Sequence, residues 1–260
     1  KEPPFIGRDK LIEELTNAYH RKGIVQINGE EGVGKTRLVR EFFTGLGFRP
    51  RLLLCTCKPN INVFPYSFLM EGLRSTLEEE DWLSLPEKVR ENLEPYVRQS
   101  GFDGAARELN ASEMLSDESK IRTFKDIALL LKHLARRKPL LMVVDNAQWC
   151  DYPTIEFFSY LNEIQFFKEH GLLILITRKE ERNDILESYL DWSILISSLE
   201  VFEVEPFSSD EVKQLISTIL GKPVDDEFAA GLWRRSGGNA FILEEIFKAL
   251  RKDDLEKGFL

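Results

Sequence analysis

The segment Gly29-Glu-Glu-Gly-Val-Gly-Lys-Thr36 carries the residues best suited to chemistry. It matches G-x-x-x-x-G-K-[ST], in which glycines let backbone N–H groups turn toward an anion and the following helix adds its positive end. In such a loop Lys35 reaches the terminal phosphates of a nucleotide, and the Thr36 hydroxyl is a ligand for Mg²⁺. A glycine-rich turn that binds nothing is the alternative, and the pattern arises by chance in roughly one chain in a hundred of this size. We therefore predict nucleotide binding.

Two carboxylates, Glu30 and Glu31, stand inside this loop and would repel a triphosphate unless they point outward or are paired. Solvated side chains at the loop tip explain them better than a catalytic role does. We expect the nucleotide to be held along the loop and the start of the next helix, by Gly29, Glu31, Gly32, Val33, Gly34, Lys35, Thr36 and Arg37.

A second anchor for Mg²⁺ is expected at the end of a neighbouring buried strand, because one hydroxyl cannot hold the ion alone. The apolar run 140–144 ends in Asp145, although many strands end in Asp because that residue favours turns. The next residue, Asn146, can orient a water molecule but cannot accept its proton, so we expect slow hydrolysis. Asp151 is the nearest alternative base, and a role as a helix N-cap explains it at least as well.

A third candidate follows the apolar run 172–176, which ends in Thr177 and Arg178. An arginine at the carboxyl edge of a sheet can contact the γ-phosphate and sense its loss. The alternative is a charge that simply ends a strand where the chain leaves the core. With a phosphate loop present we favour sensing. The predicted catalytic residues are therefore Lys35, Asp145, Asn146 and Arg178, and the predicted metal ligands are Thr36 and Asp145.

The elements that must position these residues are short apolar runs alternating with longer helical stretches. Some runs lack period-2 alternation, which is typical of strands buried on both faces of a parallel sheet. We therefore predict an α/β fold with a parallel-sheet P-loop NTPase core. Its strands are expected at residues 23–28, 51–57, 139–145, 171–177 and 198–204.

The interval between the second and third strands, about residues 59–138, is far longer than one crossover helix requires, so inserted helices are predicted there. One is marked by an apolar face and ends in a basic run at 136–138. A looser pattern suggests another, and the polar stretch 112–120 is expected to join them. The two faces comprise Ile121, Phe124, Ile127, Leu131 and Leu134, and Trp82, Leu85, Val89, Leu93 and Val97.

The chain beyond Pro206 is wholly helical in pattern. Ser208 and Glu211 have the spacing of a capping box, a second helix follows from about Asp225, and Asn239 is suited to cap a third. The predicted organisation is a core of residues 1–206 followed by a small all-helical lid domain of residues 207–260.

Charge and composition exclude several classes of protein. The 35 Lys and Arg against 44 Asp and Glu give a net charge of −9, the wrong sign for nucleic acid binding through the overall field, so we expect no direct nucleic acid contact. No apolar stretch approaches the roughly 20 residues that span a bilayer, and the first residues contain no apolar segment of a secretory signal, so we expect neither. With 3 cysteines, too few for a disulfide framework, a cytoplasmic protein is favoured. Because the first residue is not methionine, we expect a piece of a longer chain with flanking effector domains.

Together these segments resemble the nucleotide-binding module of the signal-transduction ATPases with numerous domains (STAND), a branch of the AAA+ related P-loop ATPases. Residues 5–8 resemble its F-[VI]-G-R box, and residues 145–151 resemble D-D-x-[HQ]-W-x-D. Residues 238–245 resemble G-N-P-[FL]-[FY]-[LI]-E-E of the family's lid. The phosphate loop at residues 29–38 and the strand end at residues 176–178 also resemble the family's motifs, and all of them follow in the family's order along the chain. The resemblance implies adenine contacts from Phe5, Ile6, Arg8 and Ala240.

Two departures from this family bear on function. Asn146 replaces a second Asp, which argues against efficient hydrolysis, and Ala240 replaces the lid proline, which loosens packing on adenine. The resemblance implies an ATP/ADP- and Mg²⁺-binding switch of a larger signalling or transcription-regulating protein, with slow ATPase activity; it leaves open whether ATP drives self-association. The alternatives are an AAA+ replication-initiator or DNA-loading ATPase, which the missing lid arginine disfavours, and a nucleotide-binding scaffold without turnover.

Overall fold

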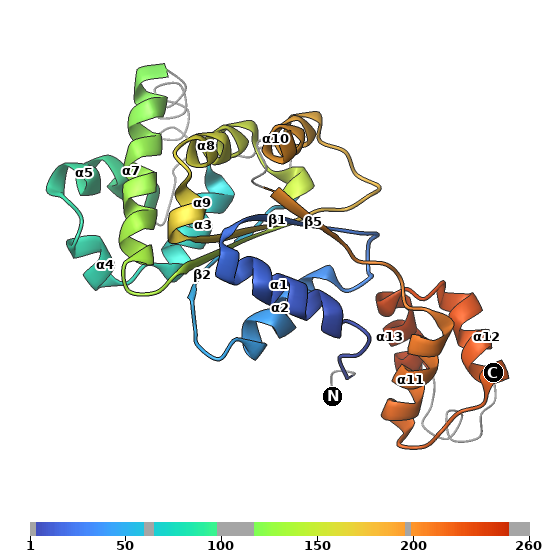
Figure 1. Ribbon diagram of the computed structural model, residues 1–260. Coiled ribbons are helices and arrows are strands. Elements are labelled where there is room, and N and C mark those ends of the chain that lie inside the picture. The colour runs from blue at the N-terminus through green and yellow to red at the C-terminus, as the bar shows by residue number, and fades with distance from the viewer. Residues whose placement is uncertain (1–3, 60–64, 98–116, 196–198, 250–260) are drawn as a thin grey trace.

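The computed structural model describes residues 4–59, 65–97, 117–195 and 199–249, and its centre is one parallel sheet (Figure 1). The strand order is β2-β3-β4-β1-β5. All five predicted strands are found, each within one residue at either end, which confirms the α/β parallel-sheet fold. Their bounds are β1 Gly23–Asn28, β2 Arg51–Thr56, β3 Leu140–Asp145, β4 Gly171–Ile176 and β5 Leu199–Glu203.

Helices cover both faces of this sheet, and the alternation of strand residues decides which face each side chain joins. Along β4, Leu172 and Ile174 belong to a cluster with α1 (Asp9–Arg21) and α2 (Lys35–Gly45). Leu173 and Leu175 belong to the opposite cluster, which contains residues of the inserted helices and of those that follow β3. Residues of β4 are therefore buried on both sides, which explains their continuous apolar sequence.

The predicted insertion contains α3 (Ser67–Thr76), α4 (Glu79–Leu83), α5 (Glu87–Val97) and α7 (Asp117–Ala135). The looser helix predicted over residues 82–97 is wrong as a single helix. The chain leaves α4 after Leu83 and restarts after Pro86, whose ring is suited to the first turn of a helix.

Two details of the longer inserted helix also differ from prediction. Four of its five predicted face residues are buried, but Ile121 is 51% exposed because it lies near the start of α7, one turn before the packed face begins. The polar stretch expected to be a joint already belongs to α7 from Asp117 onward, and its first part, 112–116, lies outside the described residues.

A short turn η1 (Ala147–Trp149) and the helices α8 (Tyr152–Glu163) and α9 (Phe166–His170) lie between β3 and β4, and α10 (Asp184–Leu195) lies between β4 and β5. Asp151 is the N-cap of α8, since its Oδ1 accepts from the Thr154 N–H at 3.0 Å and its Oδ2 from the Thr154 hydroxyl. No helix of the described residues is both long enough and apolar enough to cross a bilayer.

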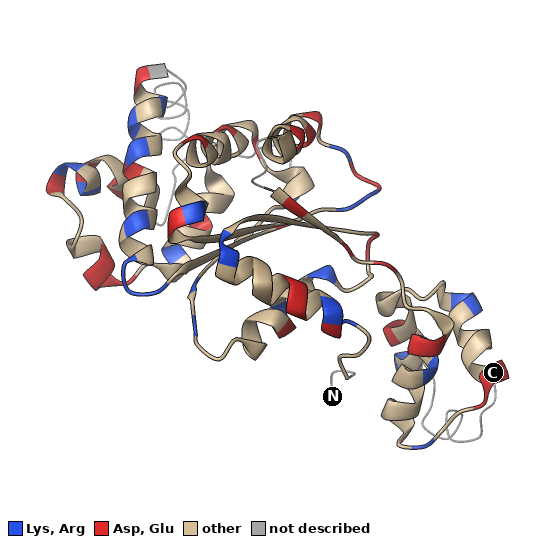
Figure 2. Ribbon diagram, in the orientation of Figure 1, with Lys and Arg blue, Asp and Glu red and all other residues tan. Residues whose placement is uncertain are grey.

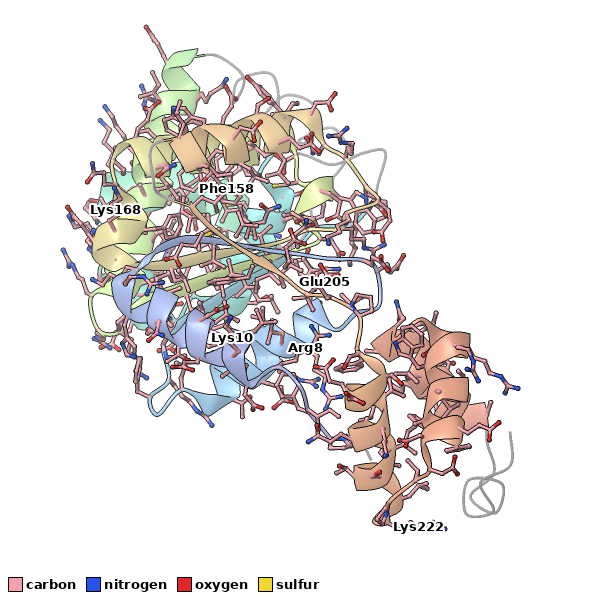
Figure 3. All side chains as sticks on the ribbon, turned by 45° about the vertical axis from the view of Figure 1, so that its right-hand side comes forward. Arg8, Lys10, Phe158, Lys168, Glu205 and Lys222 are labelled. Carbon is pink, nitrogen blue, oxygen red and sulfur yellow. The ribbon has the colours of Figure 1, made fainter. Side chains whose placement is uncertain are left out.

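The C-terminal helices α11 (Ser209–Leu220), α12 (Asp226–Ser236) and α13 (Ala240–Ala249) pack around their own apolar cluster, apart from the two clusters of the sheet (Figure 1). We call these helices the lid. The predicted capping box is present, with Ser208 N–H donating to Glu211 at 2.7 Å and Glu211 N–H donating to Ser208 at 3.2 Å. Figure 3 shows Arg8 and Glu205 where the sheet and the lid meet.

Candidate functional site

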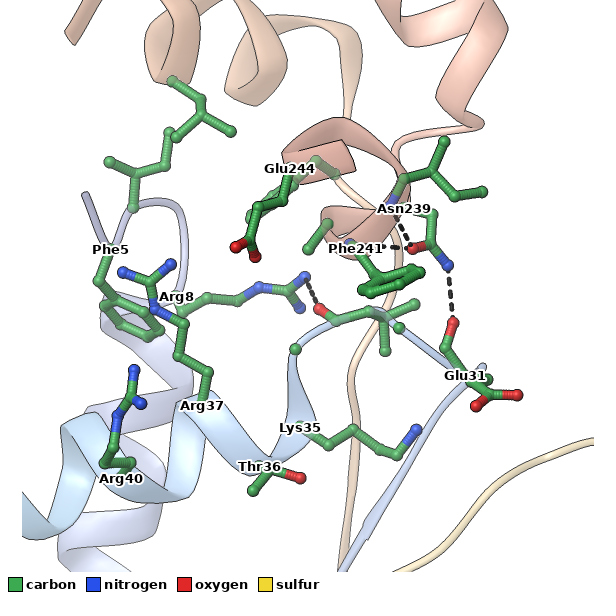
Figure 4. A pocket seen from close by; sticks show the side chains of 18 of the residues that line it. Phe5, Arg8, Glu31, Lys35, Thr36, Arg37, Arg40, Asn239, Phe241 and Glu244 are labelled. Atoms are coloured by element: carbon green, nitrogen blue, oxygen red, sulfur yellow. Dashed lines mark hydrogen bonds between the residues drawn. The ribbon is translucent and has the colours of Figure 1, made fainter. Parts of the chain in front are cut away.

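The parallel sheet brings the predicted site residues to one edge, because β3, β4 and β1 are neighbours and all end there. A cavity of about 760 Å³ opens at this edge and is closed on its other side by α13 (Figure 4). Every predicted site residue lines it except Gly29. Those that do are Phe5, Ile6, Arg8, Glu31, Gly32, Val33, Gly34, Lys35, Thr36, Arg37, Asp145, Asn146, Arg178 and Ala240.

The phosphate loop (residues 29–36) owes its shape to glycines at positions that other residues rarely adopt. Gly32 and Gly34 have φ angles of 79° and 100°. Gly29 does not line the cavity, but a Cβ there would come within 2.5 Å of the Val204 carbonyl oxygen, so only glycine fits between the loop and the chain after β5. The sequence motif thus describes backbone requirements that the neighbouring chain enforces.

Lys35 is fixed at the mouth of this loop. Its ammonium donates to the Gly29 carbonyl at 2.8 Å and to the Glu30 carbonyl at 2.6 Å, and the side chain is only 8% exposed. Burial lowers the pKa of Lys35 from its ordinary value, Arg178 lowers it further, and the nearby carboxylates of Glu180, Asp145 and Glu31 oppose the shift. An ammonium has three donors, so one remains for a ligand anion.

Asp145 and Thr36 meet at the end of β3. The Thr36 hydroxyl donates to Asp145 Oδ2 at 3.1 Å, and Asp145 Oδ1 accepts from the Asn146 N–H at 2.9 Å. Hydroxyl and carboxylate oxygens side by side are the ligand types that Mg²⁺ prefers. Asn146 has a φ of 55°, a left-handed conformation that asparagine tolerates better than most residues, so the backbone gives a second reason for this residue type.

Arg178 is held by three neighbours. Its Nη1 lies 3.0 Å from Glu31 and 3.2 Å from Glu181, and its guanidinium carbon lies 4.7 Å from the centre of the Trp149 ring. The Glu31 side chain is 70% exposed, as expected for a loop tip, yet it is also paired. We expected a carboxylate in this loop to point outward or to be paired. Glu31 does both.

The N-terminal segment forms the opposite wall of the cavity. Arg8 Nη2 donates to the Glu205 carbonyl at 2.6 Å and to the Val33 carbonyl at 3.3 Å, and its guanidinium lies 4.9 Å from the Phe207 ring centre. Burial lowers the pKa of Arg8, opposed by Glu211 and Glu205. Phe5 lies beneath Arg37, with 5.8 Å between ring centre and guanidinium carbon. An aromatic ring and a rigid cation at this end suit a flat base.

The lid contacts the phosphate loop directly. Asn239 Nδ2 donates to the Glu31 carbonyl at 2.7 Å (Figure 4). The Phe241 N–H donates to the Gly32 carbonyl at 2.9 Å. A Cβ on Gly32 would lie 2.7 Å from the Asn239 side chain, so this glycine also permits the lid to approach. Asn239 Oδ1 caps α13 as predicted, accepting from the Phe241 and Ile242 N–H groups.

Several lining residues were missed by sequence reasoning. They are Pro4, Arg40, Phe207, Leu215, Asn239, Phe241, Ile242, Glu244 and Phe247. Of these, Glu244 and Phe247 follow Ala240 by four and seven positions, so they share its helix face, and helical spacing from Ala240 is a signal that finds them. Phe207 and Leu215 carry no such signal, because only the docking of the lid turns them toward the cavity.

Comparison with known proteins gives one matching family and several solved structures of similar fold. The AAA ATPase domain matches residues 4–175. Cdc6p from Pyrobaculum aerophilum has a TM-score of 0.57 at 14% identity, covering 99% of this chain and 66% of that one. The Aeropyrum pernix ORC2 protein, solved in ADPNP–ADP complexes, has a TM-score of 0.55 at 13% identity, covering 99% and 68%. No curated protein matches. The chain thus spans about two thirds of these structures, which share its P-loop NTPase-like fold.

Proposed function

The chain belongs to the family of AAA ATPase domains, and we propose that it binds ATP and ADP with Mg²⁺ and acts as a nucleotide-operated switch. The observation that carries the proposal is the shared cavity of about 760 Å³, which the phosphate loop, the ends of β3 and β4 and the first turns of α13 line together. A ligand in it would touch the sheet and the lid at once.

The residues present fit such a ligand. Lys35 has a donor left over for a phosphate oxygen, and the adjoining oxygens of Thr36 and Asp145 suit Mg²⁺. When bound, the metal would neutralise charge on the phosphates. Phe5, Ile6 and Arg8 on one side and Ala240 on the other would hold the adenine. The other predicted contacts that line the cavity are Glu31, Gly32, Val33 and Gly34 of the loop and Arg37 in the first turn of α2.

Hydrolysis is proposed to be slow because, among the residues that the structure describes, each carboxylate lining the cavity has another partner and none is left to take the proton of an attacking water. Asn146 can only orient that water. Asp151, the alternative base, does not line the cavity, and its oxygens accept from Thr154 and from the Tyr66 N–H at 3.2 Å. Three carboxylates line the cavity in the described part of the chain. Asp145 is assigned to the metal, Glu31 pairs with Arg178, and Glu244 on α13 pairs with Lys248 at 3.0 Å.

The output would be a change in how the lid, which we assign to residues 207–260, lies on the core of residues 1–206. A nucleotide moves such an equilibrium only by its difference in affinity for the two states, and a swing from 1:99 to 99:1 requires roughly 5.5 kcal/mol. The γ-phosphate distinguishes ATP from ADP, and Lys35 and Arg178 are the cations placed to contact it. Effector domains elsewhere in a longer chain would receive this change.

The test is isothermal titration calorimetry of the Lys35→Ala variant with ATP and Mg²⁺. Loss of the ammonium should weaken binding by at least about tenfold, since charge-assisted contacts to phosphate are strong. Lys10→Ala is the matched control, because the Lys10 side chain is 88% exposed on α1 and outside the cavity. Undiminished ATP affinity in a folded Lys35→Ala protein would refute the assignment.

A replication-initiator or DNA-loading ATPase is the second candidate, favoured by the fold shared with Cdc6p and ORC2. The net charge of −9 opposes it, and Figure 2 shows acidic and basic residues interspersed over both the sheet region and the lid. Fluorescence anisotropy with a labelled DNA duplex separates the two. Binding that weakens steeply with salt would favour the DNA-loading candidate. Nucleotide binding without measurable phosphate release would instead favour a scaffold.

A further inference from the structure

The Arg178 guanidinium, which the switch needs for a γ-phosphate, is occupied by a carboxylate of the phosphate loop itself. Glu31 Oε1 lies 3.0 Å from Arg178 Nη1. The two residues come from different elements, the loop after β1 and the segment after β4, so the pair joins the two parts of the site that face the end of a triphosphate.

We propose that Glu31 sets the selectivity of this site between nucleoside triphosphates and diphosphates. Its carboxylate is one of the two that pair with Arg178 when no γ-phosphate is present, and it is the one on the phosphate loop, so ATP must displace Glu31 whereas ADP leaves the pair intact. Glu31 thereby favours the diphosphate. The inference rests on the nucleotide binding proposed above and adds to it the residue that weights the two nucleotides against each other.

The surroundings of the pair allow the exchange. The Glu31 side chain is 70% exposed, so its carboxylate is already largely hydrated and can leave Arg178 for water at little cost in free energy. Arg178 is only 19% exposed and keeps two other partners, Glu181 at 3.2 Å and the Trp149 ring. The guanidinium therefore stays in place when Glu31 leaves, ready to pair with another anion.

The lid is attached to the same residue. The Glu31 carbonyl accepts from Asn239 Nδ2 at 2.7 Å, and the next carbonyl, that of Gly32, accepts from the Phe241 N–H. A displacement of the Glu31 side chain thus occurs on the residue whose backbone holds the start of α13. Occupancy of the γ-phosphate position and docking of the lid are linked through a single position of the loop.

The neighbouring Glu30 supplies a matched comparison. It belongs to the same loop and carries the same charge, but its side chain makes no ion pair within the described parts of the chain. The E31Q and E30Q variants therefore remove one negative charge each, from adjacent positions, and only E31Q takes a carboxylate away from Arg178. Both substitutions keep the size of the side chain.

The experiment measures the dissociation constants of Mg-ADP and of a non-hydrolysable Mg-ATP analogue by calorimetry in the wild type, E31Q and E30Q. We expect E31Q to bind the triphosphate about fivefold more tightly, ~1 kcal/mol, and the diphosphate less than about twofold more tightly. E30Q should change both constants by the same small factor. The selective effect should shrink at high salt, because the pair is partly exposed.

The R178M background tests the mechanism. Without the guanidinium, E31Q should no longer change the ratio of the two dissociation constants, and a selective effect that persists would overturn the proposal. An equal change for both nucleotides in E31Q would overturn it as well. If the wild type binds neither nucleotide, the proposed function itself fails; if it binds both and the ratio does not move, only the selectivity proposal fails.

Discussion

The sheet region and the lid are each built around apolar clusters, but they are joined to each other mainly by polar contacts. Inside the sheet, Leu173 and Ile174 are 0% exposed, and inside the lid Val212 and Leu243 are 0% exposed as well. Between them run the hydrogen bonds of Asn239 and of the Phe241 N–H to the phosphate loop, the contact of the Arg8 guanidinium with the Phe207 ring, and the packing of Ile6 on the lid cluster. Polar contacts can be exchanged for water, whereas buried clusters cannot, so the junction is the part of the molecule suited to rearrange.

The largest expected effect tests whether the two regions are separate units of stability. Leu173→Ala in β4 should lower the free energy of unfolding of the sheet region by about 3–5 kcal/mol, through lost burial and a cavity. Leu232→Ala, where the residue is 1% exposed in α12, should remove about 2–4 kcal/mol from the lid alone. Hydrogen exchange measured by mass spectrometry reports both regions separately. Equal changes in both regions for either variant would show one cooperative unit instead.

The next effect concerns the junction at Arg8. Arg8→Ala removes the guanidinium that lies on the Phe207 ring and that bonds the Glu205 carbonyl, where the chain enters the lid, and the Val33 carbonyl of the loop. We therefore expect a loss of about 2–3 kcal/mol in the attachment of the lid. Distances between spin labels at Lys10→Cys and Lys222→Cys, on the sheet region and the lid respectively (Figure 3), measure the opening; the three native cysteines are buried.

The matched control for this variant is Arg21→Ala. Arg21 pairs with Glu200 at 2.6 Å on the surface, with its side chain 56% exposed, so its removal should change stability by less than about 1 kcal/mol and leave the label distance as it was. A distance that is the same in Arg8→Ala and the wild type would show that Arg8 does not hold the lid.

A smaller effect separates capping from docking at Asn239. Asn239→Asp keeps an oxygen to cap α13 but removes the donor to the Glu31 carbonyl, so lid opening should increase by about 1 kcal/mol, roughly fivefold. Asp225→Asn is the control, because it makes the reverse exchange at the N-cap of α12. The Asp225 side chain accepts from the Phe228 N–H and lies away from the phosphate loop. The same pair of spin labels should detect more opening in Asn239→Asp only. Equal label distances in the two variants would show that Asn239 only caps α13 and does not hold the lid on the loop.

The smallest effect is a difference in pH dependence. All 3 histidines precede the lid, and burial, with a smaller contribution from Lys132, lowers the pKa of His170 below its ordinary 6.5. The unfolded chain therefore takes up this proton first, so the stability of the sheet region should fall as the pH drops below about 6.5. The melting temperature of His170→Gln should therefore decrease less between pH 7 and pH 5.5 than that of the wild type, because the variant has no imidazole to take up a proton on unfolding. An unchanged decrease would assign it to other groups.

The elements of the sheet could be predicted because their signals are local. An apolar run such as Gly171–Ile176 predicts a strand from its own residues alone. The glycines, Lys35 and Thr36 of the phosphate loop likewise lie in one continuous segment. The spacing of apolar residues alone gave a wrong result at two places in the inserted helices. The apolar series from Trp82 to Val97 continues through Pro86 although the helix does not, and Ile121 fits the apolar face of α7 but lies beyond its packed part.

By itself the sequence determined which residues could do chemistry: the phosphate loop, Asp145 and Arg178 at strand ends, and Asn239 as a helix cap. Only the tertiary structure decided their partners. Asn239 bonds the loop across 208 residues of sequence, and the carboxylate of Glu31 pairs with Arg178 although nothing in either segment specifies the other. The physical reason is that backbone conformation depends on nearby residues, whereas the neighbours of a charged side chain depend on how whole elements pack.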